Sequence, residues 1–238
     1  MAPPINSIRK KSILTYLTFL AICIVGIAWG TYLVTPYPFL RVFNWMGVAT
    51  LLVGVPFLFL QTQARIPEFW EKNISNRSRI LIPMLIGIGF GVLDVIVIKG
   101  MLHTEPYTEL PPFLQPFPYS LFLYFSGAFE VEVFYRLIPI VLVLSIFSKI
   151  QGGKYLTQAF WVMAVLTAIR EPLEQLSGGQ SWFVAYALTS GFAMNFIQAV
   201  FLKKSGFIAT LSVRLGHYLI WHILLGIYVE AIELSQFA

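Results

Sequence analysis

Two glutamates and an arginine lie within seven residues of an otherwise apolar stretch, residues 129–136, which reads FEVEVFYR. The apolar run around them, residues 119–147, is of the membrane-spanning type and holds no other charge. A charged side chain at the centre of a bilayer costs at least ~3 kcal/mol on insertion scales, so three together will not face lipid. The sequence therefore predicts a membrane helix whose charged side chains face other helices, pair with one another or line a wet cavity.

The spacing of the three charges divides them between two faces of this predicted helix. Glu132 and Arg136 are four residues apart, so they lie on one face and can pair. Glu130 is two residues from Glu132, about 200° around a helix of 3.6 residues per turn. We therefore expect Glu132 and Arg136 to act together and Glu130 to point elsewhere.

The composition is that of an integral membrane protein. The 238 residues are 58% hydrophobic and 11% charged, with a mean hydropathy of +0.77, whereas soluble domains carry about 25% charged residues. The water-exposed segments are too short to fold alone, so residues 1–238 are expected to form a single membrane domain with the lipid bilayer as its partner. The net charge of +5 lies in short loops, where it sets orientation, and does not indicate nucleic-acid binding.

Seven apolar runs are long enough to be membrane helices, so we predict an all-α, polytopic transmembrane bundle. The predicted helices cover about residues 13–34, 43–62, 80–100, 119–147, 156–175, 182–202 and 207–229. The first run is too long for a signal-peptide core and is expected to be retained. It contains the only cysteine, Cys23, so the chain cannot form an internal disulfide.

Basic residues give the expected orientation of this bundle. Eleven of them lie at the N-terminus and in alternate connections: Arg9, Lys10, Lys11, Arg65, Lys72, Arg77, Arg79, Lys149, Lys154, Lys203 and Lys204. The opposite connections hold Arg41, with Lys99 at a helix end, and the C-terminal tail holds glutamates and no base. The positive-inside rule then predicts seven spans with the N-terminus inside and the C-terminus outside, in a multi-pass protein of the cell membrane.

Two further patterns concern packing and loops. The connection from about residue 102 to 118 holds five prolines and is predicted to be an ordered outer loop or cap. Gly26 and Gly30, and likewise Gly87 and Gly91, are four residues apart, a spacing that lets helix backbones approach closely. We expect these glycines to pack within the bundle, with a dimer interface as the alternative.

Other polar side chains in the predicted spans could complete a site around Glu132. They are Asp94, Arg170, Glu171, Glu174, Asn195, Gln198, Arg214, His217 and His222. Judged by depth, Glu132, Glu171, His217 and His222 could meet in a cavity in the middle to outer half of the bilayer. A glutamate there could activate water as a general base, a histidine could act as electrophile or metal ligand, and Arg136 would keep the carboxylate ionised.

The same residues also have structural interpretations, in which they perform no chemistry. These are a buried Glu132–Arg136 ion pair, interior hydrogen bonds for His217 and His222, an interfacial Arg170–Glu171 pair, and an interhelical hydrogen bond or a Lys99 partner for Asp94. His217 and His222 are five residues apart and are not a ready bidentate metal pair. Zinc is the metal to consider, although no complete ligand set is visible in the sequence.

The order of these groups over residues 119–229 resembles the CPBP family of intramembrane peptidases (CAAX protease and bacteriocin-processing, or Abi). The family's first motif, Glu-Glu-x-x-x-Arg, resembles residues 131–136, with Val131 in place of the first glutamate. The second, Phe-x-x-x-His, resembles residues 167–171, with Glu171 in place of the histidine. The third, a last-helix histidine followed four residues later by Asn or Asp, resembles the segment holding His217 and His222, which are followed at that spacing by Trp221 and Gly226.

The resemblance implies a divergent membrane endopeptidase, a hydrolase acting on a membrane-associated or prenylated peptide. Its candidate catalytic residues are Glu132, Arg136, Glu171, His217 and His222. Because Val131 replaces the presumed base, the active site is altered or lost. The alternatives are a non-catalytic relative that binds and stabilises a partner membrane protein, and a small-solute or proton carrier whose buried charges form a relay. The lack of a visible internal repeat counts against the carrier.

Overall fold

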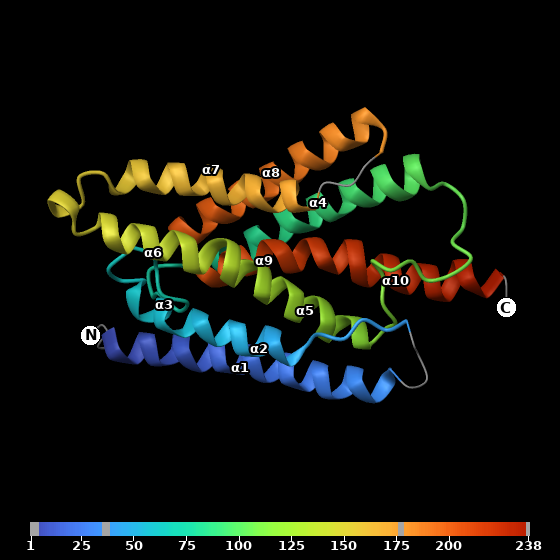
Figure 1. Ribbon diagram of the computed structural model, residues 1–238, viewed down its shortest axis with the longest axis horizontal. Helices are drawn as coiled ribbons and strands as arrows, with labels where there is room; N and C mark the ends of the chain where they lie inside the picture. Colours follow the sequence, from blue (N-terminus) through green and yellow to red (C-terminus); the bar gives the residue numbers. More distant parts are fainter. Residues whose placement is uncertain (1–4, 35–38, 176–178, 237–238) are drawn as a thin grey trace.

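A computed structural model describes residues 5–34, 39–175 and 179–236, and these residues form an all-helical bundle (Figure 1). The helices are α1 (Ile5–Leu33), α2 (Trp45–Leu51), α3 (Val55–Leu60), α4 (Ile82–Val97), α5 (Tyr119–Glu132), α6 (Ile138–Phe147), α7 (Leu156–Glu174), α8 (Ser181–Ser205), α9 (Phe207–Tyr218) and α10 (Leu225–Tyr228). The described residues contain no strand. The prediction of an all-α chain is confirmed.

Short 3₁₀ and π turns join several of these helices into longer rods. The 3₁₀ turn Leu52–Gly54 joins α2 to α3, and π turns flank or join the others at Arg77–Leu81, Ile98–Leu102, Val133–Leu137, Leu219–Leu224 and Val229–Glu233. Each of the seven stretches predicted to be helical is helical, and several extend beyond the predicted bounds, the last of them to Gln236 instead of about residue 229. The first helix begins earlier than predicted, at Ile5, and Arg9 near its start contacts Glu68 and Thr62. The second rod is interrupted by a 3₁₀ turn before Pro56, which lacks an N–H group.

Four helices are long and apolar enough to cross a membrane: Ser7–Leu33, Arg77–Leu102, Ser181–Ser205 and Phe207–Gln236. Large apolar side chains also lie exposed on the outside of the bundle, for example Leu85 on α4 and Val162 and Leu166 on α7, each more than half exposed. Water would disfavour such a surface, whereas lipid would cover it. These features are those of a membrane-associated helical bundle.

The basic connections that the sequence assigns to one side do lie at one end of the bundle. Arg9 of α1 reaches Glu68 (Nε to Oε1, 3.4 Å), and Lys203 of α8 donates to the backbone oxygen of Arg65 (3.1 Å). The connection between α6 and α7 lies at this end as well, while the last helix ends at the opposite end (Figure 1). These basic connections therefore lie together at one end of the bundle.

The 103–118 connection caps the other end of the bundle and is held by the last helical rod. The backbone N–H of Tyr107 donates to Glu233 Oε2 (2.8 Å), and that of Phe117 donates to Glu230 Oε2 (3.0 Å). Lys99 pairs with Glu233 (2.8 Å). The predicted ordered cap is confirmed, and the suggestion that Lys99 is the partner of Asp94 is wrong, because Glu233 takes that position.

Helix α9 lies at the centre of the bundle, packed against α4, α5 and α8 (Figure 1). Its approach to α4 is so close that a Cβ atom on Gly87 would lie 1.8 Å from the backbone oxygen of Val213. In the same way, a Cβ atom on Gly216 would lie 2.2 Å from the backbone oxygen of Met84. The α4 glycines thus pack within the bundle, as expected, and they bring the polar residues of α4 and α9 together.

Candidate functional site

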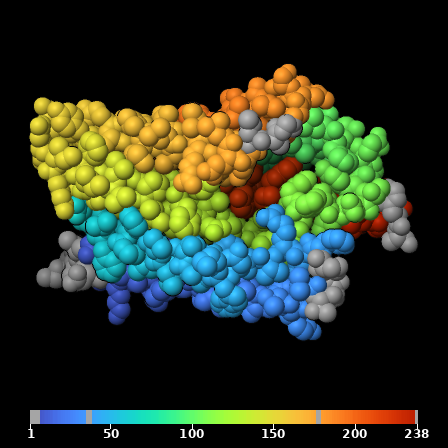
Figure 2. Space-filling view, viewed as in Figure 1, coloured from blue at the N-terminus to red at the C-terminus, as the bar shows by residue number. Residues whose placement is uncertain are grey.

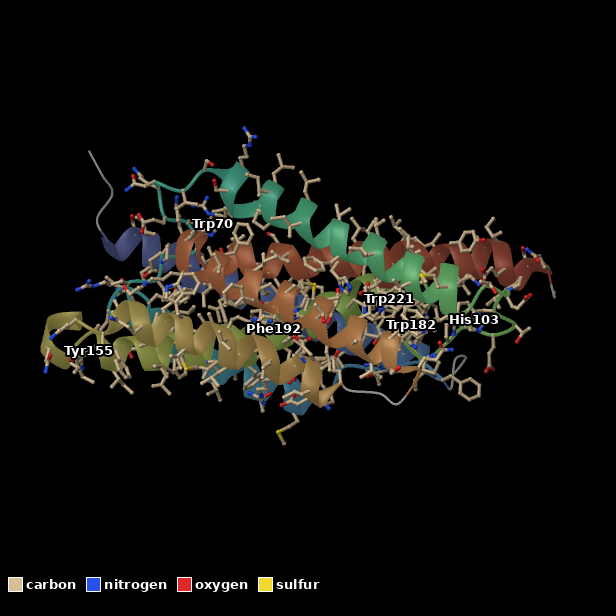
Figure 3. The ribbon with its side chains drawn as sticks, turned by 90° about the horizontal axis from the view of Figure 1, so that it is seen from above. Trp70, His103, Tyr155, Trp182, Phe192 and Trp221 are labelled. Carbon is tan, nitrogen blue, oxygen red and sulfur yellow. The ribbon has the colours of Figure 1, made fainter. Side chains whose placement is uncertain are left out.

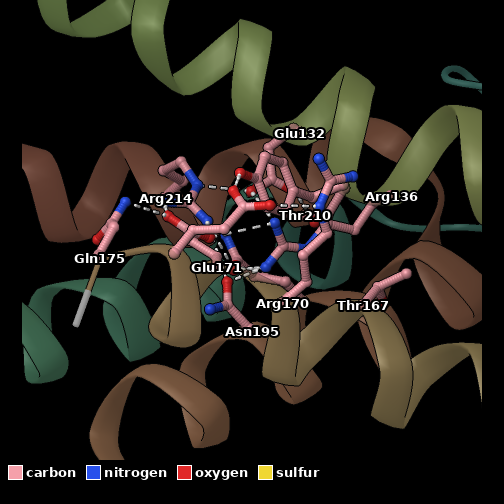
Figure 4. Close-up of polar contacts among 12 residues, drawn as sticks. Glu132, Arg136, Thr167, Arg170, Glu171, Gln175, Asn195, Thr210 and Arg214 are labelled. Atoms are coloured by element: carbon pink, nitrogen blue, oxygen red, sulfur yellow. Dashed lines mark hydrogen bonds and ion pairs between the residues drawn. The ribbon is translucent and has the colours of Figure 1, made fainter. Parts of the chain in front are cut away.

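Four ionisable side chains meet in the interior of the bundle and form what we call the charged cluster: Glu132, Arg136, Glu171 and Arg214 (Figure 4). They come from the end of α5, the π turn after it, α7 and α9. Each is at most 5% exposed. Two carboxylates and two guanidinium groups balance, so the charged cluster carries no net charge.

The predicted pairing within the α5 segment is present. Arg136 Nη1 lies 3.6 Å from Glu132 Oε1 and 3.5 Å from Glu171 Oε2. Glu132 ends α5, and the π turn Val133–Leu137 follows it. Since the change of pitch comes after Glu132, it does not bring Glu130 into the position of Val131. Glu130 is half-buried and, among the described residues, has no hydrogen bond or ion pair.

Arg214 connects the two carboxylates of the cluster. Its Nε lies 2.6 Å from Glu132 Oε1, and its Nη1 and Nη2 lie 2.8 and 2.6 Å from the two oxygens of Glu171. This bidentate geometry is the strongest form of an Arg–carboxylate contact. The sequence placed Arg214 among the polar residues that could complete the site, on the same helical face as His217, but not among the candidate catalytic residues.

Neutral side chains from α8 and α9 complete the hydrogen bonds of the cluster. Gln198 donates to Glu132 Oε1 (2.7 Å) and accepts from Arg136 Nη2 (2.9 Å). Arg136 Nη2 also donates to Asn195 Oδ1, and Thr210 donates to Glu132 Oε2. Asn195 and Gln198 were visible in the sequence as polar residues within a span, whereas Thr210 gave no signal, because hydroxyl side chains are common in membrane helices.

Hydrogen bonds and burial together leave neither glutamate placed to act as a base, because Glu171 accepts four hydrogen bonds and Glu132 accepts three and is fully buried. Glu132 Oε1 accepts from Gln198 and Arg214, and its Oε2 accepts from Thr210. Glu171 Oε1 accepts from Arg214 and Gln175, and its Oε2 accepts from both arginines. A general base must have a lone pair within reach of the proton that it removes. The geometry is that of a structural lock which joins α5, α7, α8 and α9.

His217 belongs to a second polar group, beside the charged cluster. Its Nε2 lies 2.6 Å from Asp94 Oδ2 on α4, and the hydroxyl of Tyr186 on α8 donates to Asp94 Oδ1 (2.6 Å). The Nδ1 atom of His217 is buried and has no hydrogen-bond partner among the described residues. Asp94 is therefore an interhelical hydrogen-bonding group, which was one of the two alternatives left open.

His222 is a hydrogen-bonded interior histidine. Its ring stacks on Tyr124, with centroids 4.0 Å apart and planes 7° from parallel. Its Nδ1 lies 2.8 Å from the backbone oxygen of Phe113, an acceptor, so Nδ1 carries the proton. His217 and His222 thus contact neither Glu132 nor Glu171 by a hydrogen bond.

The expected Arg170–Glu171 pair is wrong. Arg170 pairs instead with Glu174 (2.7 Å), and both of these side chains are about half exposed, at 54% and 47%. Successive residues of a helix point about 100° apart, so Arg170 faces outward while Glu171 faces the cluster. The i,i+4 spacing of Arg170 and Glu174 was the better indication of pairing.

A cavity of about 410 Å³ lies next to the charged cluster. Glu171, Arg214, His217 and His222 all border it, so four of the interior polar groups share one space. Figure 2 shows the hollow, with the atoms of the last helical rod at its floor, between α7 and the 103–118 connection. Seen from above, Trp182 and Trp221 lie in the half of the bundle that ends near His103, and Tyr155 lies at the opposite end (Figure 3).

The histidines and acids of the described ranges do not gather into a metal site. Nowhere in residues 5–34, 39–175 and 179–236 do three His, Cys, Asp or Glu side chains lie close enough together to hold a metal ion. His217 and His222 each use one ring nitrogen on Asp94 or Phe113. Zinc, the metal considered from the sequence, therefore finds no cluster of ligands in this part of the chain.

Comparisons of the chain with protein-family models, with curated proteins and with solved structures found no significant match. The features of the molecule that bear on its function are therefore the charged cluster and the cavity beside it.

Proposed function

We propose that this protein is a non-hydrolytic membrane protein of the CPBP-like type, which binds a ligand in the cavity beside the charged cluster. One observation carries the proposal: both glutamates that could act as a base are neutralised by Arg136 and Arg214. The order of motifs supports the likeness to the family, and the replacements at Val131 and Glu171 support the loss of hydrolysis. A buried, balanced ion cluster instead fixes how the helices pack around the cavity.

The first prediction is that the protein does not cleave peptides. The full-length protein in liposomes is incubated with fluorogenic peptides that carry a prenylated C-terminus, beside empty liposomes and a Glu132→Gln variant. We expect cleavage by the wild type to equal that of empty liposomes. We also expect Glu132→Gln to lower the thermal midpoint by roughly 4 °C or more, because Arg214 and Arg136 lose an ionised partner. Cleavage that Glu132→Gln abolishes in a folded protein would favour the peptidase instead.

The same proposal includes seven spans, with the N-terminus inside and the C-terminus outside the cell membrane. Two observations support it: the basic connections share one end of the bundle, and the last helix ends at the other.

Cysteine labelling tests this topology. Ser75 and Thr108 are exposed residues in connections at opposite ends of the bundle, and Cys23 is buried. In a Cys23→Ala background, we expect a membrane-impermeant maleimide added to intact cells to label Thr108→Cys and not Ser75→Cys. Permeabilised cells, in which both should be labelled, are the control. Labelling of Ser75→Cys and not of Thr108→Cys in intact cells would show that the orientation is the opposite of the proposed one.

A further inference from the structure

The cavity next to the charged cluster is lined in part by aromatic side chains. Six aromatic side chains line it: Phe90, Phe113, Phe183, Tyr186, Tyr218 and Trp221. They come from α4, the 103–118 connection, α8 and the last helical rod. Phe113 and Trp221 stack in parallel, with centroids 5.1 Å apart, and Phe183 stacks with Tyr186 at 6.5 Å. Aromatic faces are electron-rich, and walls of this kind attract organic cations.

One carboxylate that borders the cavity, that of Asp94, pairs with no arginine or lysine among the described residues. Glu171 and Arg214 cancel through their bidentate contact. His222 donates from Nδ1 to a backbone oxygen, as a neutral imidazole does. His217 contacts Asp94 through Nε2 (2.6 Å), and its Nδ1 atom has no hydrogen-bond partner among the described residues. Asp94 is therefore the carboxylate at the cavity that the arginines leave available to a ligand.

Asp94 is also the more accessible of the two carboxylates at the cavity. Its side chain is 24% exposed, compared with 6% for that of Glu171. Each of its oxygens accepts one hydrogen bond, from Tyr186 or from His217. A carboxylate has about four lone-pair positions, so Asp94 can accept a further donor or lie against a cation while Tyr186 and His217 hold it in place.

We propose that the cavity binds an organic ammonium ion with an apolar body, with Asp94 as its counter-ion and the aromatic walls around its substituents. This inference rests on the proposed function of a ligand-binding membrane protein. The ammonium could belong to a free amine or to the choline headgroup of a lipid, since both present the same chemistry to the cavity.

Two probes of equal shape and different charge test the inference. Benzyltrimethylammonium is the cation, and neopentylbenzene is its neutral carbon isostere. Binding to the detergent-purified full-length protein is measured by titration calorimetry and by the fluorescence of its tryptophans, one of which, Trp221, lines the cavity. We expect the cation to bind at least ~10-fold more tightly than the isostere, because only the cation gains from Asp94 and from the ring faces. Equal affinities would overturn the proposal.

Variants locate the binding site. Asp94→Asn keeps the shape of the side chain and removes its charge, and we expect it to weaken cation binding at least ~10-fold while leaving the isostere unchanged. Glu130→Gln, which removes one negative charge at a residue that does not line the cavity, is the matched control and should leave both affinities unchanged. An Asp94→Asn protein that binds the cation as well as the wild type does would contradict the proposal.

If Asp94→Asn does not fold, the variant Phe183→Leu tests whether the cation binds in the cavity. Phe183 lies in the first turn of α8 and is only partly buried, so its replacement leaves the charged cluster intact. We expect it to weaken cation binding about threefold or more and to affect the isostere less. An equal loss for both probes would contradict the proposal, because the ring would then act by shape alone and not on the charge of the cation.

Nanodiscs of phosphatidylcholine and of phosphatidylglycerol separate the two sources of the ammonium. Competition with benzyltrimethylammonium only in phosphatidylcholine would identify a lipid headgroup, and equal binding in both lipids would identify a free amine. The cleavage assay remains an independent readout. Peptide cleavage would refute the proposed function, whereas equal probe affinities without cleavage would refute only the cation site.

Discussion

Replacing Arg214 by methionine is expected to destabilise the protein by about 3–5 kcal/mol, the range found when one partner of a buried ion pair is removed. The substitution leaves Glu132 and Glu171 with Arg136 alone, so the interior of the bundle acquires a net negative charge. Glu171 also loses its bidentate contact at 2.6 and 2.8 Å. The measurement is equilibrium unfolding of the purified protein in mixed detergent micelles. Arg170→Met is the matched control, because the exposed Arg170–Glu174 pair should contribute only about 0–1 kcal/mol.

A double variant tests whether Arg214→Met destabilises the protein through the charge imbalance or through the change of side-chain size. Glu171→Leu combined with Arg214→Met keeps one carboxylate and one guanidinium, Glu132 and Arg136, which lie 3.6 Å apart. Balanced removal of a buried pair is often close to neutral, so we expect the double variant to be more stable than Arg214→Met alone. If the double variant loses as much stability as Glu171→Leu and Arg214→Met lose together, charge balance does not stabilise the charged cluster.

Replacing Gly87 by alanine is expected to destabilise the protein by about 1–3 kcal/mol or more, as overpacking does in a tight interior. The added Cβ atom would lie 1.8 Å from the backbone oxygen of Val213 and 2.9 Å from the backbone nitrogen of His217. Both neighbours are backbone atoms, so α4 and α9 must move apart. The Asp94–His217 contact joins the same two helices and should lengthen with them.

Gly89→Ala is the control for this change, since it lies in the same helix. A Cβ atom on Gly89 would meet nothing within 4 Å, so this variant should be neutral or should gain up to about 1 kcal/mol of helix propensity. Thermal unfolding of both variants in one detergent makes the comparison. Equal midpoints for Gly87→Ala and Gly89→Ala would mean that α4 and α9 can separate at little cost.

Local helix geometry explains which parts of the site were predictable. The Glu132–Arg136 contact depends on a spacing of four residues within one rod, and it survives the π turn between them. The same rule gives the Arg170–Glu174 pair. The prediction of an Arg170–Glu171 pair failed because it followed adjacency in the sequence, which places two side chains on different faces of a helix.

Contacts between distant helices could not be predicted in this way. Arg214 and Glu171 are 43 residues apart, and their bidentate contact requires a particular rotation of α7 relative to α9. Hydrophobic periodicity identifies the inward face of each helix without stating which inward group meets which. Asp94 and His217 meet for a similar reason, because glycines allow the backbones of α4 and α9 to come close.

The sequence by itself determined that the chain forms apolar helices, that basic connections alternate with less basic ones, and that three charges in residues 130–136 cannot all face lipid. Composition and periodicity suffice for these conclusions, because they depend on the transfer of each segment from water. The tertiary structure alone decided that two arginines neutralise both glutamates, and that Asp94 borders a cavity without an arginine or lysine partner among the described residues. The physical reason is that the environment of a buried charge is set by the side chains of other helices, whose rotation and separation are fixed only when the bundle packs.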